Sequence, residues 1–179
     1  MARKYYSRRR IIVRPKVKWS PHMETISETL DIDASAAFAY YPHVVCANAT
    51  DSHLPSVPVV QVTRINFQGH VGVNTPSAEW YLYFIYVPEG VDSSLGSWAA
   101  WQAYINSHPE YIMARTIASS DFVTNGNTTT TLKLSTSMKR NLNSGDQVVA
   151  LFVWNVLYTG SSALHLPIQG QLSYYTKVN

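Results

Sequence analysis

The sequence predicts an all-β protein built as a sandwich or a barrel. After Pro21, turn residues divide the chain into about eight strand-like segments, and only one stretch has a helical pattern. Twelve Tyr and five Trp residues, with abundant Thr and Val, favour strands over helices. Frequent short strands without alternating helices argue against βαβ units and a parallel sheet.

The expected strands are short and bounded by turn chemistry. Segment 129–138 alternates most regularly, with Leu132, Leu134 and Met138 on one face and mostly hydroxyl side chains on the other. Asn125-Gly126 before it suits a tight hairpin, and Asn143-Ser144-Gly145-Asp146 supplies the next reversal. The strands are expected near residues 22–32, 38–47, 57–67, 79–87, 111–120, 129–138, 147–158 and 167–177.

Two of these segments, 80–87 and 148–154, are apolar on both faces. A strand in a two-layer sandwich normally has one wet face, so each needs a second apolar partner. That partner is either a covering loop or a neighbouring subunit, and the aromatic content favours the subunit. The side chains expected at this subunit interface are Trp80, Tyr81, Tyr83, Phe152 and Trp154.

The single expected helix runs from about Ser93 to Ser107. Asp92 or Ser93 can cap it, and Pro109 stops it. Its apolar stripe is expected to anchor a long inter-strand loop on the sandwich rather than to bind a ligand, and consists of Leu95, Trp98, Trp101 and Ile105.

The charge is strongly polarised along the chain. Residues 1–18 hold eight of the fourteen Lys and Arg residues and no acidic residue, whereas residues 19–179 have a net charge of −5. We therefore expect two parts, a basic N-terminal arm at 1–20 and a folded domain at 21–179. A solvated tail or a nuclear-import signal alone would give the same pattern, but interleaved aromatic residues favour nucleic acid as the direct partner. The expected nucleic-acid-binding residues are Arg3, Lys4, Arg8, Arg9, Arg10, Arg14, Lys16 and Lys18, with Tyr5, Tyr6 and Trp19 stacking on bases.

Residues that would indicate catalysis or metal binding are not grouped in recognisable motifs. The six His residues are scattered, and no phosphate-binding loop is present. Asp51, Ser52 and His53 are consecutive, so their side chains cannot line up as the orienting acid, nucleophile and base of a hydrolase triad. Cys46 is the only cysteine and is expected to be a small buried hydrophobe. Asp31 and Asp33 suit a solvated strand face better than a calcium site. We expect no enzymatic activity, no cofactor and no metal.

No membrane or secretion signal is evident. No apolar stretch approaches the roughly 20 residues that span a bilayer. Residues 11–13 are too few for the apolar core of a signal peptide. We expect synthesis in the cytosol and no insertion into a membrane.

The predicted features are an arm that binds a polyanion, a rigid β body, aromatic strands suited to self-association, and no catalytic groups. Together they are typical of a protein that assembles into a closed shell around nucleic acid. Three segments also resemble the single jelly-roll capsid proteins of small circular Rep-encoding single-stranded DNA viruses, the circovirus-like group. They are MARKYYSRRR at 1–10, SMKRNLNSGD at 137–146 and PIQGQLSYYT at 167–176.

This resemblance implies an eight-stranded antiparallel jelly roll with one short helix in a loop. It also implies self-assembly into a T=1-like icosahedral shell of about 60 copies, with the basic arms facing a packaged single-stranded DNA circle. The implied locations are the virion and, during assembly, the host nucleus, reached through the host nuclear import machinery. A host receptor is implied but not identified.

Two other functions fit the same residues. The capsid protein of a single-stranded RNA satellite virus would share the fold and the arm. The arm cannot tell the two apart, because contacts to phosphates do not distinguish ribose from deoxyribose. A cellular jelly-roll module that binds carbohydrate or protein would use exposed aromatic residues but has no evident need for the arm.

Overall fold

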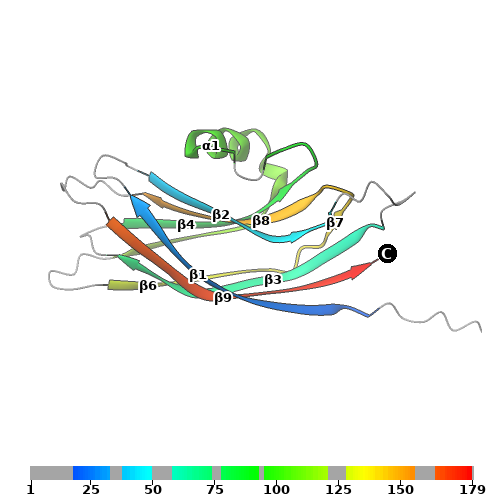
Figure 1. Ribbon diagram of the computed structural model, residues 1–179, viewed down its shortest axis with the longest axis horizontal. Helices are drawn as coiled ribbons and strands as arrows, with labels where there is room; N and C mark the ends of the chain where they lie inside the picture. The colour runs from blue at the N-terminus through cyan, green and yellow to red at the C-terminus, as the bar shows by residue number, and fades with distance from the viewer. Residues whose placement is uncertain are drawn as a thin grey trace, which may run out of the picture.

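The computed structural model describes residues 18–32, 38–49, 58–73, 78–92, 95–120, 128–155 and 164–178. Within them the chain forms two antiparallel sheets packed face to face (Figure 1). The all-β expectation is confirmed, with nine strands among the described residues in place of eight. The additional strand, β7 (Arg140–Leu142), has only three residues and was not expected from the sequence.

The first sheet is called the open sheet below. Its order is β1-β9-β3-β6, and β7 pairs with β3 at one end. Its long strands are β1 (Ser20–Ile32), β9 (Leu164–Val178), β3 (Val60–Val73) and β6 (Thr128–Thr136).

The second sheet is called the covered sheet. Its order is β2-β8-β4-β5. Its strands are β2 (Phe38–Ala47), β8 (Gln147–Asn155), β4 (Ala78–Val87) and β5 (Ile112–Ser120). All eight long strands overlap the segments that the sequence predicts.

The long strands pair in a nested order. The first strand pairs with the last, β2 with β8, β3 with β6, and β4 with its immediate successor β5. β3 also pairs with β9, and β4 with β8, which joins the nested pairs into the two sheets. Strands that follow one another in the chain therefore lie mostly in different sheets.

The main core lies between the sheets and is rich in aromatic side chains. Phe67 of the open sheet meets Phe152 of the covered sheet edge to face, with ring centroids 5.1 Å apart. Trp80 and Trp154 are neighbours in the same core, with centroids 6.2 Å apart. These four side chains are fully buried, which fixes the stacking of one sheet on the other.

Helix α1 (Trp98–Ser107) covers the outer face of the covered sheet (Figure 1). It begins later than expected, because the Ser97 side chain, rather than Asp92 or Ser93, caps it by accepting the Ala100 N–H at 3.2 Å. A single 3-10 turn, η1 (Pro109–Tyr111), follows it. Trp101 and Tyr104 pack on the apolar residues of β8 that point away from the other sheet, in a second apolar cluster. The expectation that the stripe anchors this segment on the sandwich is confirmed.

Strand β8 therefore finds both of its apolar partners within the chain, and β4 does so in part. In β8, Phe152 and Trp154 face the other sheet, whereas Leu151 and Val153 face α1. Trp80, Phe152 and Trp154 have no exposed surface, so they are not accessible to a neighbouring subunit. The expectation of an interface at these three side chains is corrected, because they pack in the core between the two sheets, while α1 covers the opposite face of β8.

Two local expectations had different outcomes. The reversal at 143–146 is confirmed, because Gly145 has φ +83° and the Asp146 N–H donates to the Asn143 carbonyl at 3.1 Å. Leu132 and Leu134 face the core as expected, but β6 ends at Thr136 and Met138 is 44% exposed. Asn125-Gly126 lies outside the described residues.

No helix in the described part of the chain is long and apolar enough to cross a membrane.

Candidate nucleic-acid interface

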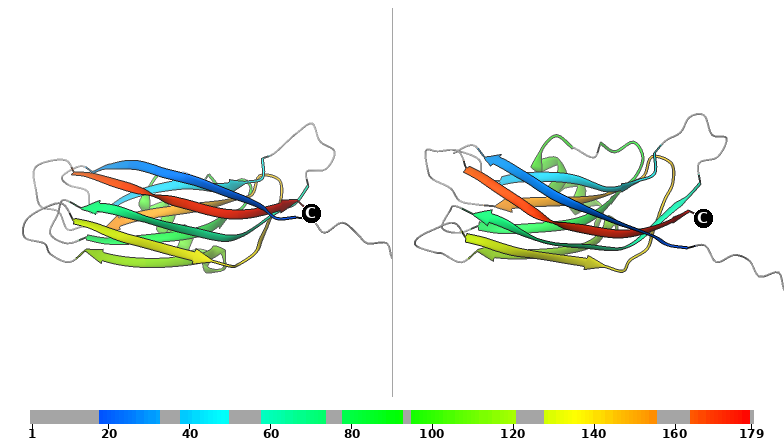
Figure 2. Two further views of the ribbon diagram at one scale, coloured as in Figure 1. Left: turned by 90° about the horizontal axis from the view of Figure 1, so that it is seen from below. Right: turned by 60° about the horizontal axis from the view of Figure 1, so that its bottom comes forward.

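The outer face of the open sheet has no described helix or strand over it. The left view of Figure 2 shows β1, β9, β3 and β6 side by side in front. Strand register places outward side chains in rows across the sheet, such as Thr25, Gln171, Gln68 and Lys133. The neighbouring row is Ser27, Gln169, His70 and Thr131. This face is therefore polar across all four strands.

Basic side chains gather on this face. Seven Lys and Arg residues lie in the described part of the chain, and Lys18 directly precedes Trp19 at its edge. Four more lie on the face itself, namely Arg64, Lys133, Lys139 and Lys177. The other two lie elsewhere. Arg115 is on β5 of the covered sheet, and Arg140 lies over the Tyr86 ring at 5.2 Å and donates to the Glu110 carbonyl.

Most described carboxylates have partners away from this face. Glu24 lies 2.5 Å from His43, between β1 and β2. Burial and then the nearby Glu28 raise the pKa of Tyr41, which places that carboxylate beside the same edge. Glu79 accepts a hydrogen bond from Tyr81 on the covered sheet. The open face is therefore left with a positive potential suited to a polyanion.

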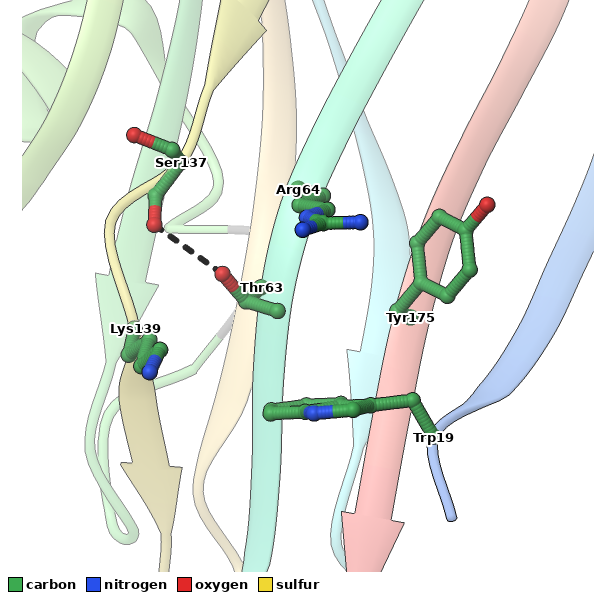
Figure 3. Close-up of a pocket in the computed structure, with 6 residues that line it drawn as sticks. All are labelled: Trp19, Thr63, Arg64, Ser137, Lys139 and Tyr175. Atoms are coloured by element: carbon green, nitrogen blue, oxygen red, sulfur yellow. Dashed lines mark hydrogen bonds between the residues drawn. The ribbon is translucent and has the colours of Figure 1, made fainter.

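At the end of the open sheet where residue 19 joins β1, a depression of about 290 Å³ combines aromatic and basic groups. We call it the aromatic–basic pocket. Figure 3 shows Arg64 between Lys139 and the Tyr175 ring, with the Trp19 ring extending below Arg64. Its lining residues are Trp19, Thr63, Arg64, Ser137, Lys139 and Tyr175.

Two basic side chains make cation–π contacts with aromatic rings at this pocket. The Arg64 guanidinium carbon lies 5.7 Å from the centroid of the Tyr175 ring. The Lys177 ammonium nitrogen lies 5.3 Å from the centroid of the Trp19 ring. Aromatic faces beside cations can stack on a base and neutralise its phosphate at the same time.

Two features of the strands build this pocket. Thr63 pairs with Tyr175 and Asn66 with Ser173, so β3 has one extra residue between these pairs, a bulge that includes Arg64. Arg64 has φ +52°, a conformation that a non-glycine residue seldom adopts. On the other side, the Thr63 hydroxyl donates to the Ser137 carbonyl at 3.0 Å and holds the segment that leads to Lys139 (Figure 3).

The structure describes only two of the expected nucleic-acid-binding residues. Trp19 lines the pocket, and Lys18 is exposed directly before it. The other nine lie outside the described residues, namely Arg3, Lys4, Tyr5, Tyr6, Arg8, Arg9, Arg10, Arg14 and Lys16.

The sequence analysis missed Arg64, Lys139, Tyr175 and Lys177. Alternation along β9 puts Tyr175 and Lys177 on one face, so their shared side could have been inferred locally. Nothing local brings Arg64 and Lys139 together, because the segments that carry them are more than 70 residues apart in the chain.

Tyr81 and Tyr83, the other two residues expected at a subunit interface, lie on the outer face of the covered sheet. Both are half-buried, and their rings stack with centroids 6.4 Å apart. Opposite Tyr81 on β5, Ile117 is 59% exposed. An apolar and aromatic surface therefore remains accessible where α1 does not cover the sheet.

Reactive and metal-binding groups are sparse in the described part of the chain. No three His, Cys, Asp or Glu side chains in it are arranged to hold a metal ion. Burial raises the pKa of the Cys46 thiol, which lowers its reactivity as a nucleophile. Asp51-Ser52-His53 and Asp33 lie outside the described residues.

Comparisons with known proteins leave the family open. No family model and no curated protein matches the sequence. Seventeen solved chains match in structure, among them the BFDV capsid protein, whose crystal structure is described as decameric. That match has 9% identity, covers 90% of this chain and 99% of the other, and has a TM-score of 0.36.

Proposed function

We propose that this protein is a viral capsid protein that packages single-stranded nucleic acid. The observation that carries the proposal is the aromatic–basic pocket at the junction of the basic arm and the open sheet. There the chain changes from a highly cationic segment to a folded surface with the same combination of cations and rings. A polynucleotide bound by the arm could therefore continue onto the open sheet, where the pocket again offers cations for its phosphates and rings for its bases.

The strand order supports a shell-forming jelly roll. The eight long strands pair in a nested order and are divided between two four-stranded layers. A long β-hairpin that folds over on itself has this arrangement. Jelly rolls of this kind occur in viral capsids and also in lectins. The arm and the polar cationic face favour the capsid over the lectin, because sugar recognition has no need for a cluster of cations.

The proposed assembly is a closed T=1-like shell of about 60 copies with the open sheets facing inward. In that arrangement the arms alone bring about 480 positive charges to the enclosed polymer. The proposed cargo is a single-stranded DNA circle, with single-stranded RNA as the alternative. The virion and, through nuclear import, the host nucleus are the corresponding proposed locations.

Contacts between copies are proposed on the exposed part of the covered sheet. Ile117 lies on β5, the edge strand of this sheet, with Tyr81 and Tyr83 beside it on β4, so another copy can approach this part of the face from the side, as a single-layered shell requires. Aromatic and aliphatic side chains of this kind are common at the centres of protein interfaces. A subunit that uses this face for self-association keeps the open sheet available for nucleic acid.

Electron microscopy of the expressed full-length protein tests the proposal. We expect closed particles of uniform diameter that contain nucleic acid protected from nuclease until the particles are disrupted. DNase and RNase digestion of the extracted polymer then identifies the cargo. A protein that stays monomeric at high concentration and low salt, and that binds no oligonucleotide, would contradict the proposal.

A further inference from the structure

A second depression lies beside the aromatic–basic pocket on the open sheet. It has a volume of about 320 Å³ and, apart from His70, is lined without ionisable side chains. We call it the glutamine groove. Its lining residues are Met23, Asn66, Gln68, Gly69, His70, Gln169, Gly170, Gln171 and Ser173.

The amide side chains of this groove are exposed and available to a ligand. Asn66, Gln68, Gln169 and Gln171 have no side-chain hydrogen bond to another residue in the described part of the chain. His70, in contrast, contacts the Thr131 hydroxyl at 3.3 Å. Each amide offers both donors and an acceptor. Four such groups in one groove can therefore match mixed donor and acceptor patterns.

The floor of the groove is bare backbone. Gly69 and Gly170 pair across β3 and β9, and the Phe67 ring fills the space beneath both. A Cβ atom at either position would approach the Phe67 Cζ atom to 2.7 or 2.6 Å. Both positions point towards the core, where Phe67 leaves no room for a side chain, so on the outer face the amides surround backbone alone.

The groove continues directly from the aromatic–basic pocket. Ser173 and Tyr175 are successive outward residues of β9, and Asn66 follows the bulge that contains Arg64. On the other side, Lys133 of β6 pairs with Gln68. Cationic side chains thus lie on both sides of the neutral glutamine groove. The groove and the aromatic–basic pocket together form one continuous polar surface along the open sheet.

We propose that the glutamine groove binds the base edges of a single-stranded polynucleotide whose phosphates are held by the arm and the flanking cations. This proposal rests on the proposed function and adds a component of binding that does not depend on charge. Neutral amides match the hydrogen-bond donors and acceptors of exposed bases, whereas phosphates are bound better by Lys and Arg. Binding through the groove should therefore persist at salt concentrations that weaken the arm.

The test is the triple variant Gln68→Ala, Gln169→Ala, Gln171→Ala in the full-length chain. Its affinity is measured for a mixed-sequence single-stranded DNA of about 20 nucleotides, from about 0.1 to 0.5 M salt. We expect binding about tenfold weaker at every salt concentration, with an unchanged slope of log K against log salt. Loss of neutral hydrogen bonds shifts the whole line, whereas loss of a phosphate contact changes its slope.

An abasic oligonucleotide of the same length separates base edges from the sugar-phosphate chain. The triple variant and the wild type should bind this probe equally. The matched control replaces Gln102 and Asn106 by Ala, because both amides are exposed on α1 and lie on the other side of the sandwich. This control should bind both oligonucleotides like the wild type. If the triple variant unfolds at a lower temperature than the wild type, the single change Gln68→Ser replaces it in the same comparison.

Three results would overturn the inference. They are unchanged affinity of the variant for the base-containing strand, an equal loss on the abasic strand, and a loss confined to low salt. Failure of particle assembly with unchanged oligonucleotide binding would also overturn it and would assign the groove to a second copy of the chain. A wild-type protein that binds neither probe contradicts the proposed function itself, so the two failures are distinguishable.

Discussion

Arg64 combines a costly backbone conformation with a charge at the centre of the aromatic–basic pocket. Its φ of +52° costs a residue with a Cβ atom about 1–2 kcal/mol. Glycine would relieve this strain but would remove the guanidinium that lies over the Tyr175 ring. Strain retained at an exposed residue is a common property of binding sites.

Arg64→Gly should therefore separate stability from binding. Relief of strain and the greater chain entropy of glycine nearly cancel, so the free energy of unfolding should stay within about 1 kcal/mol of the wild type. Affinity for single-stranded DNA should fall, and the magnitude of the salt slope should decrease by about 0.7 for one lost phosphate contact. Thermal denaturation and a salt titration measure the two quantities.

Arg115→Gly is the matched control, because Arg115 lies in regular strand on the covered sheet. It should lose about 0.5–1 kcal/mol of stability and keep its salt slope. Equal salt slopes for the two variants would contradict the role assigned to Arg64.

Trp19 is expected to supply a stacking surface rather than a charge. Trp19→Ala should weaken binding of single-stranded DNA by about 1–3 kcal/mol, because one base loses its aromatic partner. Trp19→Phe should retain most of the affinity, since a smaller ring can still stack. Fluorescence anisotropy with a labelled oligonucleotide measures both variants, and equal losses in them would exclude stacking.

Among the secondary-structure elements, β8 decides how the layers are joined. Its alternate residues pack on the other sheet and on α1, so it is buried on both faces. Ordinary two-layer sandwiches leave one face of each strand to solvent. Here α1 adds a third layer over one sheet, and the open sheet is the face that no described element covers.

Trp154→Ala should destabilise the fold by about 3–5 kcal/mol, because it leaves a large cavity between the sheets. Trp154→Phe should cost less, since the indole N–H has no hydrogen-bond partner in the described part of the chain. Chemical denaturation of the unassembled subunit measures both changes. A wild-type midpoint for the alanine variant would contradict the packing described here.

For the whole molecule, charge separation is the dominant property. The replacement of Arg8, Arg9 and Arg10 by Ala should leave the fold intact and weaken packaging. Eight arm contacts would give a log–log salt slope of about −5.6 at most, and loss of three should reduce its magnitude by about 2. A triple variant with the wild-type slope would show that the arm does not bind phosphates.

Assembly provides a separate prediction at this scale. Ile117→Glu should prevent particle formation, because it places a charge in the surface proposed to meet another copy. The unassembled variant should keep its thermal stability and its oligonucleotide affinity, since Ile117 is exposed and lies on the covered sheet, away from the open one. Particles of normal size, seen by electron microscopy, would place the subunit contact elsewhere.

Local patterns in the sequence determined the strands, the polarised charge and the helical stripe. Alternation and turn residues act over a few positions, so the eight long strands could be predicted within several residues of their observed bounds. Trp19 and Lys18 were expected from the sequence to bind nucleic acid, and the structure places both at the edge of the candidate interface. The aromatic content of the sequence favoured a neighbouring subunit as the cover for the second apolar face of β8, which α1 covers instead. A strand pattern shows that an apolar partner is required but does not show which segment supplies it.

Tertiary structure alone decided which distant residues meet. The nested pairing brings β3 beside β9, and the bulge at Arg64 turns a cation towards Tyr175 from more than 100 residues away. It also placed α1 over the covered sheet, while no described element covers the other sheet, which carries the pocket and the groove. Register and layer order arise from long-range packing of the whole core, and no short stretch of sequence contains that information.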